Sequence, residues 1–123
     1  MLYAWVALGG ALGSMARYGL ANWMATLTGP QFPWGTMLIN VVGSFVIGWF
    51  GALTGRGGML AVPPEIRVLV LVGVCGGFTT FSSFSMQTFE LFQAGEALRA
   101  AGYVLGSVAL CLGAVAIGVA VGK

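Results

Sequence analysis

Long apolar runs alternate along this chain with short clusters of glycine, proline and charged residues. A membrane-spanning helix needs about 20 mostly apolar residues. The clusters leave four segments of that kind, at about 3–27, 34–54, 65–94 and 98–121. Proline marks the first two connections, whereas glycine and glutamate mark the third. The pattern predicts an all-α membrane protein, a single domain of four transmembrane helices.

The third segment is too long for one plain crossing. A continuous helix over residues 65–94 would run about 45 Å, against a hydrocarbon core of about 30 Å. We expect a break at Gly76 and Gly77, where unpaired backbone groups could bind ions as they do in many transporters. A glycine kink filled by a neighbouring helix is the alternative. Residues 76–85 also carry five hydroxyls, and polar chain at membrane depth survives only where protein or water covers it.

Composition agrees with a membrane protein. The chain is 59% hydrophobic and 7% charged, with a mean hydropathy of +0.97, outside the range of soluble domains. No basic region precedes the first apolar run, so we expect a retained span and not a signal peptide. The net charge of +2 is too small for a nucleic-acid partner. Arginine and lysine give only a weak orientation bias, and the chain could insert in one orientation or in both.

The candidate chemistry is neutral. The chain has no His and no Asp, and its three Glu lie near predicted helix ends. Catalysis needs nucleophiles, acid–base pairs or metal ligands, so we expect no enzyme. Residues 1–64 hold no acid, which argues against proton-coupled export. The neutral polar candidates within the spans are Thr36, Asn40, the hydroxyls of residues 79–85, Tyr103 and Ser107.

Some intramembrane residues allow two interpretations. Asn40 lies deep in the second span, where its amide needs a partner, in a structural bond between helices or in a site. Arg17 is the only strong charge inside a span and is either an interfacial anchor or functional. Phe81 and Phe84 share one helix face. They form either a packed stripe or a row of partly positive ring edges that can face a small anion.

Small residues recur four positions apart and predict close helix packing. Several such faces also suit a homo-oligomer, because four helices can barely enclose a pathway alone. The pairs are Gly9/Gly13, Ser44/Gly48, Gly51/Gly55, Gly73/Gly77, Gly102/Gly106 and Gly118/Gly122.

Three blocks of sequence together resemble the Fluc/CrcB fluoride channels. They are residues 9–18 (GGALGSMARY), 35–45 (GTMLINVVGSF) and 76–85 (GGFTTFSSFS), in the order and spacing of that family. The third block is specific by itself, whereas the first two are weak alone. The resemblance implies an antiparallel, dual-topology homodimer with two fluoride pores in the bacterial plasma (inner) membrane. Such a channel exports cytoplasmic fluoride passively and protects the cell from its toxicity.

The resemblance also implies roles for single residues. The backbone carbonyls of Gly76 and Thr79 from both subunits would hold a structural sodium ion (Na+) at the dimer centre. Arg17 would lie near an aqueous vestibule. The fluoride pore would be lined by Phe81, Phe84, Asn40, Thr36, Ser82, Ser83, Tyr103 and Ser107.

Two positions depart from the family pattern. Gln87 stands where the family commonly has Glu, so the shape is kept and the charge is lost. Cys111 stands one turn beyond Ser107, where relatives can carry a hydroxyl, and is a weaker donor. We expect the pore to persist with altered throughput.

Two further functions stay open beside the leading hypothesis of a fluoride-selective channel. A small-solute or cation exporter could use the same four-span frame, but the first two spans lack a carboxylate. A structural membrane subunit could dock a partner through its glycine faces. The clustered hydroxyls at mid-membrane argue against that role.

Overall fold

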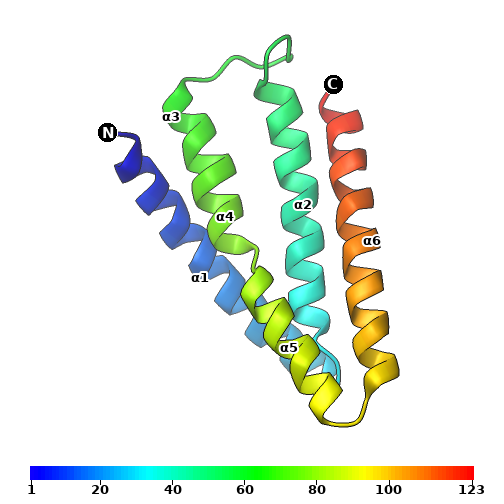
Figure 1. The fold of residues 1–123 in the computed structure, drawn as a ribbon. Coiled ribbons are helices and arrows are strands. Elements are labelled where there is room, and N and C mark those ends of the chain that lie inside the picture. The colour runs from blue at the N-terminus through cyan, green and yellow to red at the C-terminus, as the bar shows by residue number, and fades with distance from the viewer.

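The computed structural model describes residues 1–123 and is all-helical. A rod formed by α3, η1 and α4 is continued after a break by α5, so the chain forms four long helices (Figure 1). Both termini lie at the same end as the α2–α3 loop, as an even number of crossings requires (Figure 1). The bounds are α1 (Leu2–Thr28), α2 (Trp34–Thr54), α3 (Pro64–Arg67), the π-helical η1 (Val68–Val74), α4 (Cys75–Phe78), α5 (Phe81–Gln93) and α6 (Ala97–Gly122).

Three of the long helices have the length and composition of membrane spans. They are α2, the third helix over Pro64–Gln93, and α6, with mean hydropathies of 1.7, 1.7 and 2.5. The 27 residues of α1 are long enough to cross, but glycine, serine, asparagine and arginine dilute its apolar character. The prediction of four helices with a break in the third is confirmed, and the chain is a multi-pass membrane protein.

The break lies at Thr79 and Thr80, so its predicted position at Gly76 and Gly77 was wrong. Thr79 (φ −81°, ψ 159°) and Thr80 (φ −152°, ψ 109°) are extended, whereas both glycines belong to α4. Gly77 is needed for packing, because a Cβ there would lie 2.6 Å from the carbonyl oxygen of Gly10 in α1. Glycine permits a break without forcing one.

The rod before the break contains a π-helical stretch that the sequence pattern did not predict. At the end of η1, the N–H of Cys75 donates to the carbonyl of Val70, five residues earlier. A π-turn takes in more residues than an α-turn, so the rod is shorter than an α-helix of the same sequence.

Close backbone contacts join the long helices in two pairs. In the first pair α1 packs on the rod, where a Cβ on Gly73 would lie 2.8 Å from the Cα of Gly9. In the second pair α2 packs on α6, where a Cβ on Gly48 would lie 2.6 Å from the carbonyl oxygen of Val115. No side chain fits at such distances, which explains why small residues recur at these faces.

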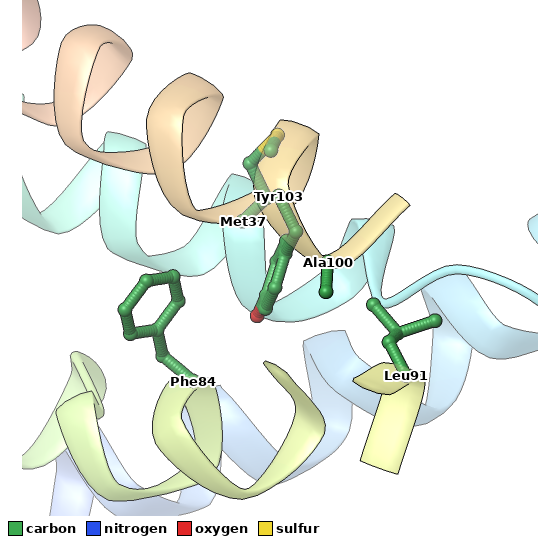
Figure 2. Close-up of a cluster of buried hydrophobic side chains, with 5 residues drawn as sticks. All are labelled: Met37, Phe84, Leu91, Ala100 and Tyr103. Atoms are coloured by element: carbon green, nitrogen blue, oxygen red, sulfur yellow. The ribbon is translucent and has the colours of Figure 1, made fainter. Parts of the chain in front are cut away.

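After the break, α5 packs mainly on α6 through side chains. Figure 2 shows the Phe84 ring projecting from α5 and the Tyr103 ring projecting from α6 into the same space. Tyr103 is fully buried. The cluster is completed by Met37 of α2, Leu91 of α5 and Ala100 of α6.

Arg67 anchors the start of the rod to the end of α2. Its Nε donates to the Oγ1 of Thr54 at 2.9 Å, and its Nη2 donates to the carbonyl of Gly51 at 3.2 Å. A cation is favoured there because the last carbonyls of a helix carry partial negative charge. The long α2–α3 loop is therefore held at both of its ends.

Candidate functional site

A groove of about 440 Å³ lies beside the helix break. No charged side chain lines it. The structure brings together here six of the predicted site residues, from α2, α6 and both sides of the break: Asn40, Gly76, Thr79, Phe81, Phe84 and Ser107.

Asn40 bonds both backbone groups of Thr80 within the break. The N–H of Thr80 donates to the Oδ1 of Asn40 at 2.8 Å, and the Nδ2 of Asn40 donates to the carbonyl of Thr80 at 3.2 Å. Because an N–H can only donate and a carbonyl can only accept, this pairing fixes which way the amide points. Asn40 thus makes the structural bond between helices. The second N–H of its Nδ2 makes no hydrogen bond within the chain.

Sequence reasoning missed the part that Thr80 plays. Its Oγ1 accepts a hydrogen bond from the N–H of Ser83 at 3.2 Å and so caps the N-terminus of α5. Threonine is a favoured N-cap residue. A threonine placed just before the helical run from Phe81 onward was the signal that could have located the break.

The carbonyls of Gly76 and Thr79 have lost their helical partners. In an unbroken helix they would accept from the N–H groups of Thr80 and Ser83, four residues later. Those two N–H groups instead donate to the side chains of Asn40 and Thr80. Gly76 and Thr79 are the residues whose carbonyls were predicted to hold sodium, and carbonyl oxygen is a ligand that suits a hard cation.

Arg17 reaches the break from α1. Its Nε donates to the carbonyl of Gly77 at 3.2 Å, and the side chain is half-buried. The guanidinium therefore offsets the negative end of the rod. Arg17 is bonded within the protein and is not a free interfacial anchor, while its place near a vestibule stays a prediction.

Aromatic rings form a row that leads from the groove toward the first loop. Ring centroids are 5.5 Å apart between Phe81 and Phe84, 5.0 Å between Phe84 and Tyr103, and 5.4 Å between Tyr103 and Phe32. Phe84 and Tyr103 are buried, whereas Phe81 is 77% exposed. The row therefore begins at the open side of the groove, passes through the helix bundle and ends at Phe32 in the α1–α2 loop.

A second cavity, of about 480 Å³, lies at the α1–α2 loop. Thr36 and Gln87 line it, together with the acidic residues Glu90 and Glu96. The hydroxyl of Tyr103 donates to the Oε1 of Gln87 at 2.9 Å, so Tyr103 connects this cavity to the row of rings. A carboxylate would accept the same hydrogen bond. Gln87 keeps the contact and removes the charge.

The remaining predicted residues differ in their surroundings. Ser107 is buried in the groove lining, and its Oγ has no hydrogen-bond partner. Buried hydroxyls without partners are uncommon, so Ser107 keeps an unused hydroxyl beside the groove. Cys111 lines the groove as well. Ser82 and Ser83 line neither cavity.

The fold and the groove define an all-α, multi-pass membrane protein with an uncharged, mainly apolar groove beside a broken helix. The family model described as "CrcB-like protein, Camphor Resistance (CrcB)" matches residues 4–119. The chain belongs to this family, and the predicted resemblance is confirmed.

Relatives match nearly the whole chain. One from Methylocella silvestris is 52% identical over 118 residues, covering 96% of this chain and 90% of the relative. One from Opitutus terrae is 53% identical over 117 residues, covering 95% and 89%. A third, from Rhodospirillum rubrum, is 54% identical over 112 residues, covering 91% and 87%. All three bear the name fluoride-specific ion channel FluC.

Proposed function

We propose that this protein is a fluoride-selective ion channel that lets cytoplasmic fluoride leave passively and so protects the cell from fluoride toxicity. The observation that carries the proposal is the uncharged groove beside the helix break, which Asn40, Ser107 and Phe81 line together. The names of the relatives support the same function. A channel of this kind needs no catalytic group.

Neutral donors suit the conduction of a small anion. Removing such an ion from water into a low dielectric costs on the order of tens of kcal/mol, so donors must replace the water along its path. A fixed cation would hold the ion, whereas conduction needs sites weak enough to leave. The Ser107 hydroxyl, the spare N–H of Asn40 and the partly positive ring edges of Phe81 and Phe84 meet both requirements.

The route that we assign runs from the groove to the cavity at the first loop. Fluoride would pass Phe81 and Phe84 and then reach Tyr103, whose hydroxyl already bonds Gln87. Gln87 and Thr36 open into the loop cavity. A carboxylate in place of Gln87 would add a third acidic group to a cavity that Glu90 and Glu96 already line, and its ionised form would repel the anion at the point where the route enters.

The open side of the groove supports a homodimer. Phe81 is 77% exposed in the single chain, and an anion cannot follow a groove that is open to lipid. A second copy that covers the groove would enclose the route and bring Ser82 and Ser83 into it. The weak charge bias between the two ends of the molecule agrees with an antiparallel, dual-topology arrangement.

The residues at the break fit a structural sodium ion at the centre of that dimer. The carbonyls of Gly76 and Thr79 from each subunit would hold it, since their helical donors are bonded elsewhere. Carbonyl ligation suits a hard cation. The ion would supply positive charge that offsets the free carbonyls and ties the two subunits together.

We assign the channel to the bacterial plasma (inner) membrane. In acidic surroundings fluoride enters cells as neutral HF, dissociates in the less acidic cytoplasm and is trapped there as the ion. A passive pathway in this membrane is then sufficient for export. The alternating apolar spans and polar ends of the chain are compatible with that location.

Ion efflux from liposomes that contain the purified protein tests the channel. Fluoride is read with an electrode, and chloride is followed in parallel. We expect rapid fluoride efflux with negligible loss of chloride. Equal loss of both ions would contradict the selectivity, and no efflux from a folded dimer would contradict the channel itself.

Single-site labelling tests the dual topology. Met59 is exposed in the α2–α3 loop, so we would introduce Met59→Cys into a protein whose Cys75 and Cys111 are replaced by Ala. An impermeant thiol reagent should reach about half of the labels from each face of the vesicle. Labelling from one face alone would contradict the antiparallel dimer.

A further inference from the structure

We propose that Asn40 is the positioning residue of the helix break, and that one amide therefore controls both the anion groove and the carbonyls at the cation site. The link to the cation rests on the proposed function. The structural part rests on the hydrogen bonds of Thr80 alone.

The local chain does not force the break. Neither proline nor a residue with positive φ lies there, and Gly76 and Gly77 are helical. Extended backbone at membrane depth needs partners for its polar groups. Asn40 supplies a partner for both the N–H and the carbonyl of Thr80. The amide on α2 therefore determines where the third helix opens.

The effect of Asn40 passes to two carbonyls in turn. By holding the N–H of Thr80, it removes the helical donor of Gly76. With Thr80 extended, the Oγ1 of that residue takes the N–H of Ser83 and removes the helical donor of Thr79. Both freed carbonyls thus depend on one side chain that does not touch them.

This arrangement couples the cation to the anion groove. A cation held by the free carbonyls stabilises the open break, and the open break holds Asn40 in place beside the groove. Coupling between two sites is reciprocal. Sodium should therefore fix the spare N–H of Asn40, and loss of Asn40 should weaken sodium binding.

Three variants of the full-length protein separate these roles. Asn40→Leu keeps the volume and removes both hydrogen bonds, whereas Asn40→Asp keeps an acceptor for the N–H of Thr80. Asn22 is the other asparagine in the chain, exposed on α1. Asn22→Leu is therefore the matched control. The readouts are hydrogen exchange at the Thr80 amide and the shift of the thermal midpoint with Na+, with K+ as the reference at equal ionic strength.

For Asn40→Leu we expect roughly tenfold faster exchange at Thr80 and a roughly tenfold higher Na+ concentration for the same thermal shift. Asn40→Asp should keep slow exchange, and Asn22→Leu should match the wild type. Asn40→Leu with a wild-type value in either measurement would overturn the inference that one amide controls both. If Asn40→Leu does not fold, fast exchange at Thr80 in Asn40→Asp would overturn it.

Two further outcomes separate this inference from the proposed function. A wild-type protein that conducts no fluoride, with Asn40 variants that shift as expected, would refute the channel and leave the positioning role intact. A conducting wild type without any specific response to Na+ would overturn the coupling.

Discussion

The two halves of the third membrane helix pack in opposite ways. Before the break, η1 and α4 lie with their backbone directly against the backbone of α1, at Gly9 and Gly73. After the break, α5 contacts α6 through side chains such as Phe84 and Tyr103. The first half is fixed by the absence of side chains, and the second half is held by the side chains that line the proposed pore.

The difference indicates a division of labour within one helix. Backbone contact tolerates no added atoms, so changes in the first half should act on folding. Side-chain contact in the second half leaves room beside the rings, and changes there should act on ion flux. Asn40 stands at the junction of the two halves.

The largest effect is expected from adding one methyl group to the first half. Gly9→Ala would place a Cβ 2.9 Å from the Cα of Gly73, where neither backbone can yield. We expect a loss of about 3 kcal/mol or more in the free energy of unfolding. Gly19→Ala on the same helix meets nothing within 4 Å and should be neutral or gain up to about 1 kcal/mol. Denaturant unfolding of both variants measures the difference, and equal stability would contradict the close backbone contact between Gly9 and Gly73.

Phe81→Ile tests the second half. The change keeps the bulk of the side chain and removes the ring edge, so fluoride flux should fall by roughly tenfold while the dimer persists. Phe92→Ile is the control, because Phe92 is an exposed phenylalanine on the same helix that lines neither cavity. Liposome efflux with size-exclusion chromatography checks both points. Unaltered flux in Phe81→Ile would remove this ring from the pathway.

Gln87→Glu should have a smaller effect that depends on pH. The hydroxyl of Tyr103 can still donate to the new side chain, so the fold should persist. The ionised carboxylate repels fluoride and the protonated form does not. Flux should therefore fall severalfold as pH rises through the pKa of the new group. Gln93→Glu, at the exposed end of α5, should keep the wild-type pH profile, and a flat profile in Gln87→Glu would place residue 87 off the route.

The number of helices, their close contacts and the region of the candidate site were predictable from the sequence. Hydropathy and loop punctuation predicted the four helices, and the spacing of small residues predicted the close contact at Gly73 and Gly77. Residues 76–85 also marked the region of the site. These features depend on residues that are near one another along the chain, so a local pattern can reveal them.

The position of the break and the π-helical stretch were not predictable in the same way. The break depends on a hydrogen bond between Asn40 and Thr80, which are 40 residues apart. The prediction relied on the paired glycines and therefore placed the break at Gly76 and Gly77. The π-helical stretch lies in a run of valine and leucine that an α-helix would also accept. The contact between Asn40 and Thr80 is one that a single sequence does not display, and Thr80 as an N-cap residue was the only local signal of the break.

Ser107→Ala gives the smallest expected effect and the clearest separation of folding from flux. The Oγ of Ser107 is buried without a partner, and an unsatisfied buried hydroxyl costs about 1–3 kcal/mol. Its removal should leave stability unchanged or raise it by up to about 1 kcal/mol, while fluoride flux falls a few-fold because one donor is lost. Ser85→Ala is the control, since the Ser85 hydroxyl is exposed and donates to the Phe81 carbonyl of its own helix at 3.0 Å. A residue with only a structural role does not lower flux when its replacement raises stability, so the expected result would assign the Ser107 hydroxyl to the route. A Ser107→Ala protein with unchanged flux would assign this hydroxyl to packing instead. The donors of the groove would then be restricted to Asn40 and the rings.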